Sequence, residues 1–208
     1  MPSESKISKH KTSRLIKDVA GVILVGGKSS RFGKNKALVK LNGIPLLDRV
    51  ISVMSSLFQH LVLITNTPDE YAHLNLPMHE DLIKNLGPLG GIYTGLTVIR
   101  ERIGFFVGCD MPFLSTGLIR HMVETRGDFD VVIPEVSGKV EPLHGLYNQN
   151  CLPVIKNMID SGALQINRFF PEVLVRYVCE VEIRKFDPKL RSFVNINRPD
   201  ELRRLKKI

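Results

Sequence analysis

The sequence has no hydrophobic run close to the roughly 20 residues that a membrane-spanning helix needs. Its first residues are basic and polar and lack the apolar core of a secretory signal. Hydrophobic residues nevertheless make up 43% of the 208 residues, which argues against a disordered chain. This length suits a single α/β domain with a sizeable core. We expect a folded protein with no membrane partner.

Cysteine is scarce. The three cysteines, Cys109, Cys151 and Cys179, form no C-x-x-C pair and no combination with histidine that has the spacing of a metal site. Their odd number and wide spacing do not suit a disulfide framework. We therefore expect a reducing compartment, the cytoplasm.

Acidic residues are outnumbered by basic ones, 21 against 29, which leaves a formal net charge of +8. Residues 1–17 hold five basic residues against one glutamate, and residues 203–207 hold a second basic cluster. The chain has no aromatic-studded basic face and no zinc-finger or RNA-binding pattern, so we expect no nucleic-acid partner. Anionic small substrates account for a basic pocket equally well. We interpret residues 1–18 as a basic, flexible tail and residues 19–208 as one domain.

The most informative stretch is residues 19–38, VAGVILVGGKSSRFGKNKAL. Its apolar run, residues 19–25, is rich in β-branched residues and is typical of a strand buried on both faces, as in a parallel sheet. Gly26 and Gly27 follow, and glycine lets the backbone turn sharply while an anion approaches its N–H groups. The loop then carries four cations. Together these features suit a polyphosphate.

Two known phosphate-binding patterns do not fit this loop. The P-loop pattern fails because no glycine lies five residues before Gly33 and because Lys34 is followed by Asn35. The dinucleotide fingerprint fails because the glycines are adjacent. The glycine pair alone is compatible with a solvated turn. With Arg31, Gly33 and Lys36 at their spacings, we favour an anion site.

The chain alternates strands and helices, which predicts an α/β fold with a doubly wound, mostly parallel sheet and helices on both faces. Short apolar runs predict strands at residues 60–66, 105–109 and 130–136, and alternation predicts another at 173–183. A strand-like piece at 37–42 and the Asn42-Gly43 turn precede an amphipathic helix at 47–58. Further helices are expected at 92–102, from Ser115 to about 125, at 151–159 and at 163–170.

Two other places carry groups suited to nucleotide chemistry. Asp110 follows the apolar run 105–109, and a carboxylate at the end of a parallel strand lies where ligands bind and suits Mg²⁺. A helix cap or turn aspartate is the alternative. Asp81 precedes a second glycine-rich turn, NLGPLGG at 85–91. A ligand-free loop that enters a helix is equally possible there, but with the first loop we favour a second wall of one nucleotide pocket.

These motifs together resemble the nucleotidyltransferases of the molybdenum cofactor guanylyltransferase type. LVGGKSSRFGKNK resembles the family pattern L-x-G-G-x-S-x-R-M-G-x-D-K, with Asn35 in place of the aspartate. GPLGG resembles G-P-L-A-G, CDMP resembles C-D-x-P, and EPLHGLY at 141–147 resembles E-P-L-x-A-[LV]-Y. The closing NINRPDEL resembles N-[IV]-N-T-P-E-[DE]-L, with Arg198 in place of threonine. The resemblance extends from Val19 to about Leu205.

The resemblance implies a Rossmann-like enzyme that transfers GMP from GTP to the terminal phosphate of molybdopterin, or its molybdenum-loaded form, and releases pyrophosphate. Mg²⁺ is the implied cofactor, with Asp110 as its ligand, and the implied catalytic residues are Lys36, Arg31 and Asp110. The implied substrate contacts are Leu24, Val25, Gly26, Gly27, Lys36, Asn66, Asp81, Asp110, Pro142 and Asn197, the last two with Glu141 and Leu143 on the acceptor side.

His144 lies in the EPLHGLY motif, and imidazole suits acid–base work. We expect a packing or hydrogen-bonding role instead, because the resembling family varies at this position.

Two other functions remain open from the sequence. One is a related nucleotidyltransferase that uses CTP or a sugar phosphate, although Gly26-Gly27 and GPLGG favour the guanine-specific branch. The other is a non-catalytic nucleotide-binding protein, which is favoured by the two differences from the family patterns, at Asn35 and Arg198. The guanylyltransferase activity would imply transient contact with molybdoenzymes or their insertion chaperones.

Overall fold

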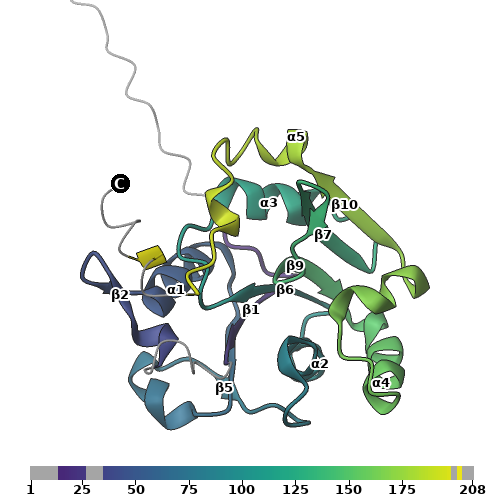
Figure 1. The fold of residues 1–208 in the computed structure, drawn as a ribbon, viewed down its shortest axis with the longest axis horizontal. Coiled ribbons are helices and arrows are strands. Elements are labelled where there is room, and N and C mark those ends of the chain that lie inside the picture. The colour runs from purple at the N-terminus through teal and green to yellow at the C-terminus, as the bar shows by residue number, and fades with distance from the viewer. Residues whose placement is uncertain (1–13, 27–34, 198–200, 203–208) are drawn as a thin grey trace, which may run out of the picture.

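The computed structural model of the chain describes residues 14–26, 35–197 and 201–202. At its centre lies an eight-stranded sheet in the order β10-β7-β9-β6-β1-β4-β5, with β8 paired to β7 (Figure 1). Its strands are β1 (Ala20–Val25), β4 (Leu61–Thr65), β5 (Met78–His79), β6 (Ile103–Gly108), β7 (Val131–Val136), β8 (Lys139–Val140), β9 (His144–Asn148) and β10 (Val175–Cys179).

The sheet is mostly parallel, which confirms the predicted class. β1 pairs in parallel with both β4 and β6, β4 with β5, and β10 with β7. β9 is antiparallel to both of its neighbours, β6 and β7. No strand was predicted at β9, because its residues, HGLYN, form neither a continuous apolar run nor a strict alternation of apolar and polar residues.

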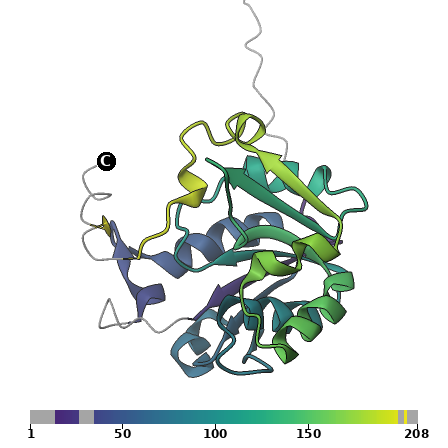
Figure 2. The ribbon, with the colours of Figure 1, turned by 45° about the vertical axis from the view of Figure 1, so that its right-hand side comes forward.

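Helices cover both faces of the sheet, as predicted. The helices α1 (Leu46–Leu57) and α3 (Thr116–Glu124) contribute to one buried cluster, together with residues of β1 and β6 such as Ile23 and Phe105. The helices α2 (Gly87–Val98) and α4 (Leu152–Asp160) contribute to a second cluster with Val22 and Phe106. Since Val22 and Ile23, and likewise Phe105 and Phe106, are adjacent in a strand, the two clusters lie on opposite faces of the sheet. Figure 2 shows helices on both sides of the sheet.

The amphipathic helix and the first turn were predicted well. Asn42 and Gly43 both have positive φ, 51° and 82°, in the hairpin between β2 (Lys40–Leu41) and β3 (Ile44–Pro45). Ser115 caps α3, because its side-chain oxygen accepts a hydrogen bond from the Leu118 N–H at 3.3 Å. The strand expected at 37–42 was wrong in its first half, where the chain forms a 3₁₀ turn, η1 (Lys36–Leu38).

Three other expectations were wrong in extent or type. The helix expected at 92–102 is α2, which begins five residues earlier, at Gly87, and ends at Val98. The segment 163–170 forms η4 (Ile166–Glu172), a 3₁₀ helix. The strand expected to run to residue 183 ends at Cys179, and α5 (Glu180–Ile183) follows it. The remaining 3₁₀ segments are η2 (Pro68–Leu74), η3 (Gln149–Cys151) and η5 (Arg191–Phe193).

The end of the predicted tail contacts the domain. The Ile16 N–H donates to the Leu57 carbonyl at 2.8 Å, and the Ile16 carbonyl accepts from the Gln59 N–H at 2.9 Å. Among the helices of the described residues, none is long and apolar enough to span a membrane.

Candidate functional site

The strands that carry the predicted site residues end at one edge of the sheet. β1 lies between β4 and β6 and runs parallel to both. The chain passes from β1 to β4 on one side and returns to β6 on the other, so β1 marks the point where the strand order reverses. In open α/β sheets, ligands bind in the crevice outside the carboxyl ends of the strands at such a point.

Three predicted residues lie at the end of β1, namely Leu24, Val25 and Gly26. Leu24 packs under α2: a Cβ on Gly91 would lie 3.1 Å from both Leu24 methyl carbons. A Cβ on Gly26, by contrast, would have no described neighbour within 4 Å, so side-chain packing does not demand glycine there. Gly27 and Arg31 fall outside the described residues.

The structure brings Lys36, Asp110 and Asn197 together from distant parts of the chain. The Lys36 ammonium donates to Asp110 Oδ2 and to Asn197 Oδ1, at 2.7 Å each. The Lys36 and Asp110 side chains are 19% and 24% exposed, so the ion pair is partly buried but still reaches the surface. The Ile196 N–H also donates to the Asp110 carbonyl at 3.1 Å, which fixes the C-terminal segment against the end of β6.

Asp110 is the candidate metal ligand. Within the described ranges, no group of three or more histidine, cysteine, aspartate or glutamate side chains could hold a metal ion. A single carboxylate suits Mg²⁺, which usually keeps water and binds through one or two carboxylates plus substrate phosphates. The donor set therefore fits a cation that arrives with a nucleotide better than a resident metal site.

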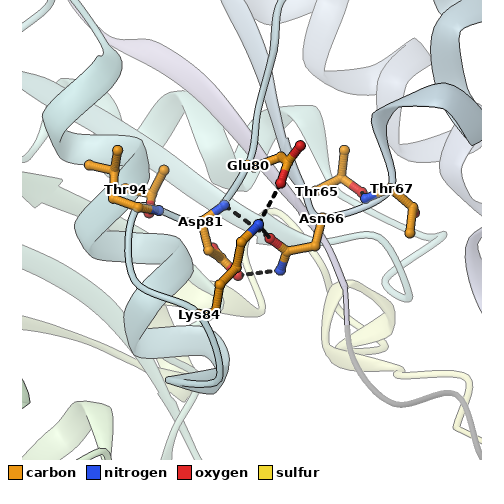
Figure 3. Close-up of polar contacts among 8 residues, drawn as sticks. Thr65, Asn66, Thr67, Glu80, Asp81, Lys84 and Thr94 are labelled. Atoms are coloured by element: carbon orange, nitrogen blue, oxygen red, sulfur yellow. Dashed lines mark hydrogen bonds and ion pairs between the residues drawn. The ribbon is translucent and has the colours of Figure 1, made fainter.

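Asn66 and Asp81 meet where β4 and β5 end (Figure 3). Asn66 Nδ2 donates to Asp81 Oδ2 at 2.6 Å, while Asn66 Oδ1 accepts from the Asp81 N–H at 3.2 Å. Lys84 donates to the same Asn66 oxygen at 2.7 Å and to Glu80 at 2.5 Å. These partners fix the orientation of the Asn66 amide and hold the Asp81 carboxylate beside it.

Sequence reasoning missed Lys84 and Glu80. They lie in a polar segment without clear periodicity, and the one available signal was their i,i+4 spacing with opposite charges. The segment is also tied to α2, because the Leu82 N–H donates to the hydroxyl of the buried Thr94 at 3.0 Å.

The second glycine-rich turn begins α2, and its glycines have packing reasons of their own. Gly87 has φ of 60°, and a Cβ on Gly90 would lie 2.9 Å from the Leu86 Cβ. The residue before the helix makes no side-chain capping hydrogen bond. A helix N-terminus without such a cap is a suitable neighbour for phosphate.

Among the described contacts, none joins Pro142 to Lys36, Asp110 or Asn197. The Pro142 carbonyl accepts from the Tyr147 hydroxyl at 2.7 Å, and Pro142 lines a cavity of about 340 Å³. The other residues of that cavity come from the start of α2, from β8 and from the turn before and within η4: Pro88, Val140, Leu164, Gln165, Ile166 and Asn167. The neighbouring Glu141 is half-buried, and burial raises the pKa of its carboxyl group against the opposing effect of Lys139.

His144 is fully buried and packs edge-on against the rings of Phe105 and Phe193. Neither ring nitrogen has a hydrogen-bond partner in the described part of the chain. Burial lowers the pKa of His144 to about 4, against the opposing charge of Asp187. This side chain therefore packs in the core.

Asn197 was predicted for the acceptor side, with Pro142. Its side chain accepts a hydrogen bond from Lys36, and the acceptor-side role stays a prediction.

Comparison with known proteins gives consistent matches. Residues 21–173 match the model of a family described as the MobA-like NTP transferase domain. The chain is 34% identical to a probable molybdenum cofactor guanylyltransferase of Carboxydothermus hydrogenoformans, over 89% of the chain and 94% of that relative. It is 38% identical to the molybdenum cofactor guanylyltransferase of Desulfosudis oleivorans, over 88% and 92%. A crystal structure of molybdopterin-guanine dinucleotide biosynthesis protein A from Archaeoglobus fulgidus superimposes with a TM-score of 0.80 at 28% identity, covering 90% of this chain and 97% of that one.

Proposed function

The chain belongs to the MobA-like NTP transferase family, and on that premise we propose that it transfers GMP from GTP to the terminal phosphate of molybdopterin, with or without molybdenum. The relatives named as guanylyltransferases support the choice of reaction. The observation that carries the proposal is the contact of Lys36 with Asp110 and Asn197 at the carboxyl ends of β1 and β6.

The reaction needs little proton chemistry. An oxygen of the acceptor phosphate attacks the α-phosphorus of GTP, a new P–O bond forms, and the bond to the bridging oxygen breaks as pyrophosphate leaves. A phosphate monoester is already anionic near neutral pH, so no strong general base is required. Catalysis then rests on positioning and on the stabilisation of negative charge.

Lys36 supplies that charge stabilisation in our proposal. Its ammonium would contact the GTP phosphates, assisted by the backbone of the Gly26-Gly27 loop and by Arg31. Asp110 would hold a divalent cation, Mg²⁺, which neutralises phosphate charge when bound. Because Asp110 Oδ2 also accepts a hydrogen bond from Lys36, the lysine would fix the orientation of the carboxylate.

The nucleoside would lie between the end of β1 and the Asn66–Asp81 pair. Leu24, Val25 and Gly26 would contact it from one side. The hydrogen-bonded amide and carboxylate would offer a donor and an acceptor from the other. The acceptor would use the cavity beside Pro142, with Glu141 and Leu143 near it. The dinucleotide product would pass to molybdoenzymes or their insertion chaperones, which we propose as transient partners.

Pyrophosphate release from GTP, measured with and without molybdopterin and Mg²⁺, tests the proposal. Lys36→Ala and Asp110→Ala should each lower turnover by about 10²–10³-fold, because each removes charge stabilisation from the crevice. Lys40→Ala is the matched control, since Lys40 is an exposed lysine four residues away. It should keep wild-type turnover.

Other outcomes would overturn the proposal in distinct ways. Near-normal turnover in Lys36→Ala or Asp110→Ala would remove those residues from the mechanism. Preference for CTP, or transfer to a sugar phosphate, would assign the chain a different nucleotidyltransferase reaction. Binding of GTP with no release of pyrophosphate in the presence of acceptor would indicate a non-catalytic nucleotide-binding protein.

A further inference from the structure

Asn35, directly before Lys36, begins the short turn that carries the lysine. Its side-chain Oδ1 accepts a hydrogen bond from the Ala37 N–H at 3.0 Å and so caps η1. The turn is only three residues long, and Ala37 is buried beneath it. The backbone direction at Lys36 therefore depends on where this one side chain is held.

The other end of the Asn35 amide is held by η2. Asn35 Nδ2 donates to the Tyr71 hydroxyl at 2.6 Å and to Glu70 Oε2 at 2.5 Å. Tyr71 is 2% exposed, and burial raises its pKa, so it is a neutral phenol fixed in the core. Both N–H donors of the amide are thus bound to residues of η2, and its oxygen is bound to the backbone of η1.

This arrangement requires an amide. An aspartate, which the resembling pattern has at this position, could still cap η1 but has no hydrogen to donate. It would set a carboxylate against the Glu70 carboxylate at hydrogen-bonding distance, where two like charges repel. Asparagine at position 35 is therefore complementary to glutamate at position 70, because the amide donates the hydrogen bond that the carboxylate accepts.

We propose that Asn35 is a positioning residue for Lys36: clamped by Glu70 and Tyr71, its amide orients η1 so that the Lys36 ammonium reaches Asp110 and Asn197. The link to turnover rests on the proposed function, since it is there that Lys36 acts on the phosphates. The effect of Asn35 on the position of Lys36 does not depend on the proposed function.

The test is a rescue experiment. Asn35→Asp should lower kcat for pyrophosphate release by about 10- to 100-fold, as expected for a displaced catalytic group. Glu70→Gln alone should stay within about threefold of wild type, because the glutamine carbonyl can accept the same hydrogen bond. In the double variant, the glutamine amide can donate to the new aspartate, so kcat should return to within about threefold of wild type.

Asp69→Asn is the matched control for charge. Asp69 lies on η2 next to Glu70, and its removal subtracts the same charge without touching the Asn35 amide in the described structure. Combined with Asn35→Asp, it should restore nothing. If it rescues as well as Glu70→Gln does, the effect is one of local charge and the positioning proposal is wrong.

A second readout works without any turnover. The rate at which Lys36 reacts with trinitrobenzenesulfonate, with Lys40 as the internal reference, reports how well the ammonium is held. Asn35→Asp should raise the Lys36 rate severalfold and the double variant should lower it again. Unchanged reactivity would overturn the proposal. If the wild-type protein fails to use GTP but this pattern appears, only the proposed function fails.

Asn35→Ser guards against a variant that does not fold. Serine keeps a capping oxygen for Ala37 but has no amide to bridge to η2. We expect the same loss of kcat and the same rise in Lys36 reactivity. If Asn35→Ser behaves as wild type, capping alone positions Lys36 and the clamp to η2 has no such role.

Discussion

Acidification should destabilise this protein through one side chain in particular, His144. The unfolded chain can protonate this imidazole at its ordinary pKa of 6.5, whereas burial lowers the pKa in the fold to about 4. Between these two values the unfolded state binds a proton that the folded state does not. The free energy of unfolding contributed by this residue is therefore complete above pH 6.5, falls as the pH drops, and levels off below about pH 4.

The size of the loss follows from the two pKa values. Their separation, from 6.5 to about 4, corresponds to about 3 kcal/mol at roughly 1.4 kcal/mol for each pKa unit. No solvent screening reduces it, because the ring is fully buried between Phe105 and Phe193. For a chain of this size such a loss equals a decrease in Tm of roughly 6–12 °C.

Urea unfolding at several pH values between about 7.5 and 4 measures the effect. Carboxylates titrate in the same window, so the informative quantity is the difference between wild type and His144→Leu, which cannot bind a proton. At about pH 7.5 the variant should be as stable as wild type or more so, because it no longer buries two ring nitrogens that lack partners within the described residues. As the pH falls, the variant should gain about 3 kcal/mol on wild type.

Leu146→Ala is the control for packing. Leu146 lies on the same strand and is 2% exposed, so its truncation should cost about 2–5 kcal/mol at every pH. Its stability curve should stay parallel to that of wild type. If the difference between wild type and His144→Leu is equally flat across pH, then His144 either finds a proton-accepting partner or reaches solvent, and the reasoning fails.

Three further outcomes can be checked with simple assays. Burial raises the pKa values of Cys109 and Cys151 to about 12, while Cys179 is exposed. Ellman's reagent should therefore modify only Cys179 rapidly in the native protein and all three thiols after denaturation. Rapid modification of either buried thiol would contradict this. Gly95→Ala should lower the unfolding free energy by about 1–3 kcal/mol, because its Cβ would lie 2.5 Å from an aromatic ring on β6. Gly26→Ala, with no described neighbour in reach of its Cβ, should unfold as wild type does but bind GTP more weakly in a thermal-shift titration.

The parallel strands at the centre of the sheet, and the edge where ligands bind, could be predicted because both are indicated by apolar runs of a few residues and by the residues that directly follow them. The apolar run ending at Val25 and the run ending before Asp110 read as buried strands without any knowledge of their partners. Their parallel pairing then followed from the helices between them. Chemistry at the strand ends was consequently visible from the sequence.

The start of α2 was missed because glycine and proline disfavour helices in isolation. In the fold, the absence of side chains is what lets this helix approach the sheet. Gly91 lies on Leu24, and a Cβ on Gly95 would collide with Phe106. Tertiary packing thus outweighs local propensity here, and no window of sequence around Gly87 contains the strands that make the difference.

The end of β10 was missed for a different reason. The alternation of apolar and polar residues continues through Glu180 and Glu182, although β10 ends at Cys179. The hydrogen-bond partners of these two glutamates favour the end of the strand. Glu180 accepts hydrogen bonds from Arg184, one turn ahead, and Glu182 binds both Arg176 and His121. The first pair favours helix locally, but the second depends on α3, which lies 61 residues away from Glu182 in sequence.

The partner of Lys36 at Asn197 could not be predicted from position, since 161 residues separate the two. The structure gives a physical reason why the end of the chain matters to a site built on a parallel sheet. Asp110 is fixed because it directly follows the β6 region of the sheet, whereas Lys36 lies on a three-residue turn outside the sheet and needs other contacts to orient it. One side of that turn is held by Asn35 and η2, and the ammonium itself is held by Asn197. Asn197 in turn is fixed because the preceding residue, Ile196, binds the backbone of Asp110, so the same aspartate anchors both the lysine and the group that aims it.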